Sequence, residues 1–444
     1  MLKISTSFTL FITEIKSISS IAYPILVAFL SHLLIGFTDN VMAGRYSSVD
    51  LAAVSIGSAI WLPLYLFFSS ILSGLTPLLA KSFAENNRDK SQELYSSGLT
   101  MAIHLSIINI LIISLLIPMI NFFVTDINLR TITIKYLFYI LFGLPGFLFY
   151  QVVRSSFEAK GETTPIMFSS FLGLIINIPL NYIFIYGRFG IPPFGGAGCG
   201  IATTLSIYNM LLLLYIFHKR TNDLFYTKYD FKTISYLFRF GLPIGISTFL
   251  EAFIFSFGSI LLSPFGYQVV ASHQIALNFI STIFMIPLSL GIAISVRVSQ
   301  QLGKNNLYYS TKIWKSGIIF VEIVALFSSI IIYLLSDYIL KLYTNDHNVI
   351  SIAYPLLILS ICFHIIDAFQ VTANNILKGY HNTKFPMFVS IFSYWIISLP
   401  LGLLFVYYFK LSAFGFWLAL IIGVVLAAVI LGHKLFSKYN FKNM

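Results

Sequence analysis

The sequence contains few charged residues. Only 10% of its 444 residues are Asp, Glu, Lys or Arg, whereas a soluble domain carries about 25%. Hydrophobic residues make up 58% of the chain and aromatic residues 17%. This balance excludes an ordinary soluble protein and predicts a polytopic membrane protein.

Cysteine is also scarce, and signatures of catalysis are missing. The two cysteines, Cys199 and Cys362, lie in apolar surroundings, which excludes a disulfide framework and a cysteine metal site. The eight histidines are scattered, and no phosphate-binding glycine loop or hydrolase signature occurs. We therefore expect no enzyme, no cofactor and no ATP-driven mechanism.

The net charge of +11 is not gathered on one soluble face. It is spread over short loops, so we expect no nucleic-acid partner. Lys3, Glu14 and Lys16 interrupt the first twenty residues, and no small-residue cleavage site follows an apolar core. We expect the first span to remain as an anchor in the lipid bilayer.

Apolar stretches long enough to cross a bilayer recur along the chain. About 20 apolar residues cross the hydrocarbon core as a helix. Twelve spans are predicted, at residues 17–42, 52–80, 96–123, 132–154, 165–187, 197–217, 240–263, 268–297, 313–336, 349–376, 386–409 and 413–433.

The positive charges predict the orientation of these spans. With the N-terminus inside, 21 of the 27 Lys and Arg residues fall on the inner side. The remaining six are Arg45, Arg130, Lys135, Arg188, Lys341 and Lys410. An excess of Lys and Arg marks the cytoplasmic side, so we expect both termini in the cytoplasm.

The two halves of the chain repeat each other weakly. Residues 83–87 align with residues 302–306 at an offset of 219, and 150–151 align with 369–370 at the same offset. Three further matches pair Gly161, Pro165 and Pro179 with Gly379, Pro386 and Pro400. Five matches in one order predict two lobes of six helices in the same orientation.

This repeat predicts an all-α integral membrane protein. Its two six-helix lobes would be related by a pseudo-two-fold axis along the membrane normal. The basic stretch at the midpoint separates an N-lobe, 1–218, a cytoplasmic linker, 219–239, and a C-lobe, 240–444. Transporters bind substrate in or between such lobes, whose rocking gives alternating access.

Four acids fall inside the predicted spans. An acid at the centre of the bilayer costs about 2.5–3.5 kcal/mol on insertion scales, so it needs a partner, a proton or a cation. Glu251 stands in the middle of the apolar stretch 240–263, while Glu322 has no other polar residue near it in its span. The four are Asp39, Glu251, Glu322 and Asp367.

Three C-lobe helices carry polar groups that can face inward. Asp367 lies in a polar span, Phe363 is four residues earlier on the same helical face, and Gln274 and Asn278 are four apart. With Glu251, these oxygens would suit Na⁺, whereas burial and mutual repulsion of two carboxylates would favour a bound proton. The alternative is a polar network that only joins the helices.

The N-lobe offers a second polar chamber. Asp39 shares its span with Pro24, which permits a kink, and Asn177 and Asn181 lie four apart on one helical face. We expect these amides to meet Asp39. The alternative is that Asp39, near the outer end of its span, reaches out to water.

Four stretches resemble the multidrug and toxic compound extrusion (MATE) transporters, most closely the bacterial NorM-type subgroup. They are GFTDNVMAGRYSSVDLAAVSIGSAIW, PPFGGAGCGIATT, VVASHQIALNFIS and HIIDAFQVTANNILKGY. The resemblance runs from about residue 20 to 435. It implies a twelve-helix, two-lobe antiporter that exports organic cations and drugs in exchange for Na⁺ or H⁺.

The resemblance also implies roles for individual acids. The family's acids that match Glu251 and Asp367 form the second-lobe cation site, a possible Na⁺ site, and the acid that matches Asp39 is the essential carboxylate of the first lobe. The NorM-type pattern has a tyrosine where this chain has Phe363. A phenyl ring provides no oxygen for Na⁺, so we expect H⁺ to couple at least as well.

Two other functions remain open from the sequence. A lipid-linked glycan flippase of the same two-lobe plan needs a cationic cavity, but Lys and Arg are nearly absent from the spans, with Arg154 and Arg297 at marginal ends. A membrane-embedded enzyme or receptor needs a nucleophile, a metal cluster or a sizeable ligand domain. We expect instead a monomer that binds small organic cations and a monovalent cation.

Overall fold

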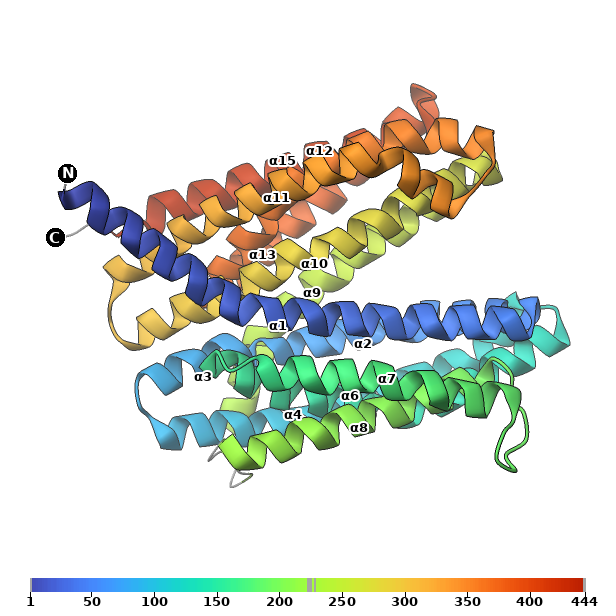
Figure 1. Cartoon of the computed structure of the whole chain (residues 1–444), viewed down its shortest axis with the longest axis horizontal. Coiled ribbons are helices and arrows are strands. Elements are labelled where there is room, and N and C mark those ends of the chain that lie inside the picture. Colours follow the sequence, from blue (N-terminus) through green and yellow to red (C-terminus); the bar gives the residue numbers. More distant parts are fainter. Residues whose placement is uncertain (1, 222–225, 227–228, 442–444) are drawn as a thin grey trace. The chain divides into compact units, whose positions relative to one another are not determined.

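All regular secondary structure in the part of the chain that the structure describes is helical (Figure 1). The computed structural model describes residues 2–221, 226 and 229–441, with only the backbone described for 2–10 and 221. Within these ranges, twelve helices are long and apolar enough to cross a membrane, which confirms the predicted number. The predicted linker falls partly on residues 222–225 and 227–228, which lie outside the described residues.

Several spans are built from more than one helical segment. The first six spans are formed by α1 (Leu2–Tyr46), α2 (Ser48–Ser73), α3 (Leu75–Ala84), α4 (Arg88–Leu116), η1 (Ile117–Met119), α5 (Ile120–Phe123), α6 (Ile127–Lys160), α7 (Thr164–Tyr186) and α8 (Ala197–Thr221). The last six are formed by α9 (Phe231–Leu262), η2 (Ser263–Phe265), α10 (Tyr267–Gly303), α11 (Leu307–Tyr343), α12 (His347–Gly379), α13 (Lys384–Ser390), η3 (Ile391–Ser398), α14 (Leu399–Leu403), η4 (Leu404–Tyr408) and α15 (Ser412–Lys438).

The helices extend beyond the apolar stretches that predict them, because their ends are capped. Helix α11 begins at Leu307, six residues before the predicted span, and Asn306 accepts a hydrogen bond from the Tyr309 backbone N–H at 3.1 Å. Such a cap satisfies a backbone donor that the first turn leaves unpaired. The polar first turn can therefore remain helical outside the hydrocarbon core.

The asparagine pairs of the sequence repeat adopt the same turn. Asn86 and Asn305 have positive φ values of 54° and 55°, and each stands just before a helix cap. Asn87 caps α4 by accepting from the Lys90 N–H at 3.0 Å, as Asn306 caps α11. Asparagine tolerates this left-handed conformation better than most residues, which explains why Asn recurs at both turns.

One aligned pair of the repeat differs in the structure. Gly161 follows α6 directly in the left-handed conformation with φ of 81°, whereas the left-handed residue after α12 is His381, with φ of 60°, two residues beyond the helix end. Gly379, which the sequence aligns with Gly161, is still helical. A Cβ there would lie 2.8 Å from the Ser295 carbonyl oxygen, so the small residue lets α12 approach α10 closely.

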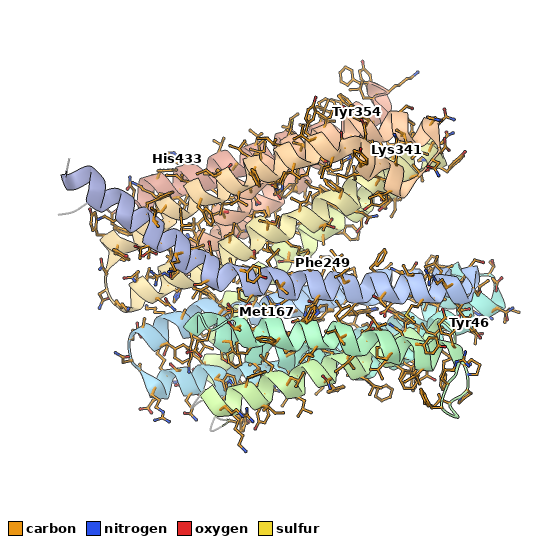
Figure 2. All side chains as sticks on the ribbon, viewed as in Figure 1. Tyr46, Met167, Phe249, Lys341, Tyr354 and His433 are labelled. Carbon is orange, nitrogen blue, oxygen red and sulfur yellow. The ribbon has the colours of Figure 1, made fainter. Side chains whose placement is uncertain are left out.

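The chain divides into two compact units. One comprises Pro24–Gly245, and the other combines Met1–Tyr23 with Ile246–Met444. The boundary falls inside α1, where proline removes a backbone hydrogen bond and permits bending. In the second unit, Lys341 near the end of α11 and His433 near the end of α15 lie at opposite ends, as antiparallel spans require (Figure 2).

The start of α1 is attached to its own unit by a buried acid. Glu14 is 1% exposed, and both of its oxygens accept hydrogen bonds from Arg297 at 2.9 Å. The Tyr309 hydroxyl also donates to Glu14 at 2.6 Å. A buried charge is stable when it is paired and hydrogen-bonded in this way.

Candidate functional site

Asp39 is buried at the meeting point of three helices of the unit Pro24–Gly245. Its side chain is 5% exposed. Asn181 of α7 donates from Nδ2 to its Oδ1 at 2.6 Å, and Thr203 of α8 donates from Oγ1 to its Oδ2 at 2.7 Å. Both oxygens therefore point into the protein, and this arrangement does not match an acid that reaches out to water.

The two asparagines of α7 form the wall of this cluster. Asn181 also donates to Asn177 Oδ1 at 2.9 Å. Within the described part of the chain, Asn177 Nδ2 and Asn181 Oδ1 are buried and have no hydrogen-bond partner. A buried polar atom without a partner costs about 1–3 kcal/mol, so these atoms mark a position where a polar ligand could bind.

The sequence did not single out Thr203, although it belongs to the glycine-rich stretch at the start of α8. A Cβ at Gly200 would lie 2.7 Å from the Tyr136 carbonyl oxygen, and a Cβ at Gly198 would lie 2.7 Å from the Phe184 carbonyl carbon. These two glycines let α8 pack closely on α6 and α7. The close approach brings Thr203 within hydrogen-bond reach of Asp39.

Glu251 is the centre of a second cluster, in the unit that contains Ile246–Met444. Ser390 donates from Oγ to Glu251 Oε1 at 2.7 Å. Glu251 also lies within electrostatic range of Asp367 and Lys378, two residues of α12. The structure thus places the two predicted C-lobe acids near each other and adds a cation, Lys378, which the spacing along the helices does not predict.

Ser390 occupies a special position in the eleventh span. It ends α13, and the next segment, η3, is a wider π-helical turn. Such turns are frequent at functional sites because they change the direction of side chains. Buried Tyr394 lies in η3 and is within electrostatic range of both Asp367 and Glu251.

Asp367 is buried and has no hydrogen-bond partner in the described part of the chain. Phe363, one turn earlier, is 2% exposed. Its ring packs edge-on against Phe255 at 5.9 Å and Trp417 at 6.1 Å between centroids. Aromatic packing therefore surrounds the predicted neighbour of the ion site, and no oxygen of that residue is available to Asp367.

Gln274 and Asn278 are placed differently from the two acids. Both are exposed on α10, and Gln274 donates from Nε2 to Ser259 Oγ at 2.7 Å. Neither is hydrogen-bonded to Glu251 or Asp367 among the described residues. The structure therefore does not bring these two amides to the acid cluster, where the sequence predicts them as ligands.

Positive charges inside the helices are neutralised by acids. Arg154 is buried in α6 and donates from Nε to Glu158 at 2.7 Å, where Thr76 also donates at 3.0 Å. Arg297 pairs with Glu14. The sequence places both arginines at the ends of their spans, but each lies six residues before the end of its helix. The helices continue past the apolar core, so the end of an apolar stretch is not the end of its helix.

Glu322 has no such partner. It is half-buried on α11, and its Oε1 has no hydrogen-bond partner among the described residues. The described residues also contain no group of three or more His, Cys, Asp or Glu that could hold a metal ion.

Comparisons with known proteins match almost the whole chain. The family model MatE matches residues 24–183 and 243–404. "Probable multidrug resistance protein NorM" of Shewanella oneidensis is 38% identical over 94% of this chain and 93% of its own. "Multidrug resistance protein MdtK" of Pectobacterium atrosepticum is 36% identical over 95% of each chain.

The fold is also found among solved structures. The crystal structure of the eukaryotic MATE transporter AtDTX14 superposes with a TM-score of 0.88 over 97% of each chain. At 20% sequence identity, this similarity concerns the fold alone.

Proposed function

Because this chain belongs to the MatE family of transporters, we propose that it is a multidrug efflux antiporter that exports organic cations in exchange for H⁺ or Na⁺. Its relatives NorM and MdtK are named as multidrug resistance proteins. As a transporter it is not an enzyme. The observation that carries the proposal is the buried carboxylate of Asp39 between two donors from other helices.

A buried acid can serve exchange because it binds one positive charge at a time. A cationic drug at Asp39 would replace the coupling ion, since two cations on one carboxylate would repel each other. The unpaired atoms of Asn177 and Asn181 would then provide hydrogen bonds to the substrate or ion. Glu251 and Asp367 provide a pair of acids in the other unit.

Proton coupling is the favoured form of the proposal. Na⁺ needs several oxygen ligands, and Phe363 offers none. Asp367 has no hydrogen-bond partner among the described residues, while Glu251 accepts only from Ser390. A proton needs no coordination shell, so it suits this aromatic environment better than Na⁺. Sodium coupling remains the alternative at the same two acids.

A lipid-linked glycan flippase is the second candidate, and the charge pairing speaks against it. Such a protein must hold a pyrophosphate with unpaired cations. Arg154 and Arg297 are each bound to a glutamate. Lys378, another described cation inside a span, lies within electrostatic range of Glu251. Paired cations attract an anionic substrate weakly.

We further propose that the protein acts as a monomer in the bacterial inner membrane with both termini in the cytoplasm. The excess of Lys and Arg on one side of the twelve spans supports this orientation.

Reconstitution in liposomes tests the function. Efflux of ethidium, a cationic dye, should be driven by an imposed proton gradient. Efflux under an imposed Na⁺ gradient is measured separately. In drug-sensitive cells, the protein should lower ethidium accumulation until ion gradients are collapsed. Efflux that continues on ATP alone would rule out the antiporter.

A further inference from the structure

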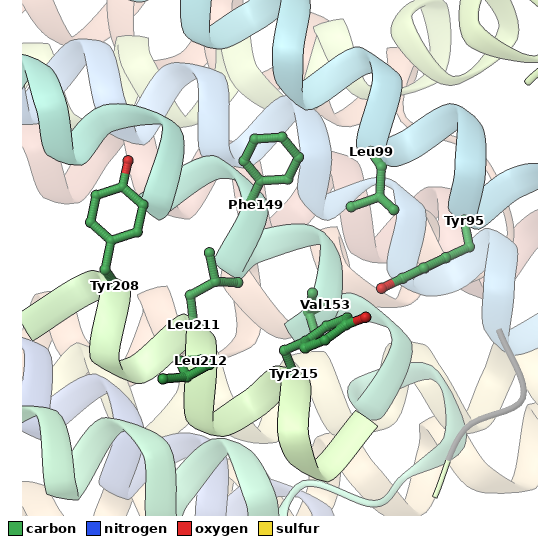
Figure 3. A pocket seen from close by; sticks show the side chains of 8 residues that line it. All are labelled: Tyr95, Leu99, Phe149, Val153, Tyr208, Leu211, Leu212 and Tyr215. Carbon is green, nitrogen blue, oxygen red and sulfur yellow. The ribbon is translucent and has the colours of Figure 1, made fainter. Parts of the chain in front are cut away.

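A pocket of about 390 Å³ lies between α4, α6 and α8 of the unit Pro24–Gly245 (Figure 3). Its lining is apolar or aromatic and includes Leu99 of α4, Val153 of α6 and Leu212 of α8. Leu212 is 56% exposed on a membrane span, so the pocket opens toward lipid. None of its lining residues belongs to the clusters around the buried acids.

The two ends of the pocket differ in their polar atoms. Tyr95 and Tyr215 lie at one end, and Tyr208 lies at the other (Figure 3). The Tyr208 hydroxyl donates to the Phe142 carbonyl oxygen at 2.8 Å, so it is already bound. The ring of Tyr95 stacks on His218 at 5.0 Å and closes the other end against α8.

Basic residues follow the lining residues on the same helices, toward the end of the pocket that Tyr95 closes. Lys219 follows Tyr215 by four residues and is exposed on the same face of α8. Arg88 precedes Tyr95 by seven residues, hence on the same face of α4, and Lys160, whose ammonium lies 5.4 Å from the centroid of the Phe83 ring, ends α6. Each of the three helices therefore carries a cation at its cytoplasmic end, as assigned by the charge bias.

We propose that the pocket binds an anionic phospholipid of the cytoplasmic leaflet. One acyl chain fills the apolar pocket, and the phosphate lies beside the Lys219 ammonium and the Tyr215 hydroxyl. Basic pockets between spanning helices at the cytoplasmic side are suited to anionic headgroups. A cationic drug would find no carboxylate among the lining residues, which distinguishes this pocket from the proposed transport sites.

Native mass spectrometry of the delipidated full-length protein in detergent tests the proposal. The first molecule of palmitoyl-oleoyl phosphatidylglycerol should bind more tightly than the first molecule of phosphatidylcholine with the same acyl chains. Lys219→Ala should weaken phosphatidylglycerol binding by about fivefold, the usual effect of one cation near the membrane surface. The matched control is Arg220→Ala, because Arg220 is also exposed at the end of α8 but points about 100° away from Lys219.

Filling the pocket tests the acyl-chain part. Leu99→Trp should weaken binding of the first molecule of either lipid. Leu111→Trp, elsewhere on α4, should leave this binding unchanged. If Leu99→Trp does not fold, Leu212→Trp fills the pocket from its exposed side. The proposal is overturned if Arg220→Ala weakens binding as much as Lys219→Ala, or if a folded pocket-filling variant keeps its first lipid.

Discussion

The amide of Asn181 donates a hydrogen bond to the carboxylate of Asp39 at 2.6 Å, across 142 residues of sequence. A hydrogen bond to a charged group contributes about 1.5–3 kcal/mol. Thr203 adds a second such bond at 2.7 Å. When a proton or cation neutralises Asp39, both bonds weaken, and we expect α7 and α8 to hold α1 less firmly at this point.

Removing the charge at Asp39 should stop transport. Asp39→Asn keeps the size of the side chain but cannot bind a cation, so dye efflux should fall to the level of empty liposomes. Thr203→Val should lower efflux several-fold, because one of the two donors is lost. The control is Asp126→Asn, which removes an exposed helix-capping acid and should transport normally. Normal efflux by Asp39→Asn would exclude Asp39 from the exchange.

The two acids of the other unit should be needed as well. Glu251→Gln and Asp367→Asn should each abolish gradient-driven efflux while the protein still inserts and folds. The neutral amides keep the shape but remove the charge that binds a proton or cation. Glu322→Gln serves as the matched control, since this acid has no partner in the described part of the chain. If both variants transport at the original rate, the site has been assigned to the wrong residues.

Phe363 offers a test of the coupling ion. Phe363→Tyr places a hydroxyl near Asp367 and should shift coupling toward Na⁺, because the new oxygen can coordinate the ion. The measurement compares efflux driven by a proton gradient with efflux driven by a Na⁺ gradient, for both proteins in matched buffers. An original protein that needs Na⁺ and ignores the proton gradient would show that other oxygens complete the site.

The Glu14–Arg297 pair should stabilise the protein. Arg297→Met leaves Glu14, which is 1% exposed, without its cation. Breaking a buried pair in this way costs about 3–5 kcal/mol, so the unfolding temperature should fall clearly in a thermal-shift assay. Lys90→Met is the control, because its partner Glu85 is at the surface and such pairs contribute about 0–1 kcal/mol. Equal shifts for the two variants would contradict the prediction.

The sequence by itself determined the number of spans and the acids that carry an energetic penalty because they lie inside the bilayer. The bilayer imposes a minimum helix length, so twelve apolar stretches predict the twelve observed spans. Asn86 and Asn305 could be matched because asparagine suits the left-handed turn that both adopt. Asp39, Glu251 and Asp367 could be singled out because an acid in a span carries an energetic penalty wherever it faces.

Only the tertiary structure decided which side chains meet those acids. Thr203 reaches Asp39 because Gly198 and Gly200 allow α8 to pack closely on its neighbours, and helical spacing does not reveal the rotation of one helix against another. For the same reason, Ser390 rather than Gln274 is the hydrogen-bond partner of Glu251. A pattern along one helix predicts which residues share a face, but the partner of that face depends on packing between helices distant in sequence.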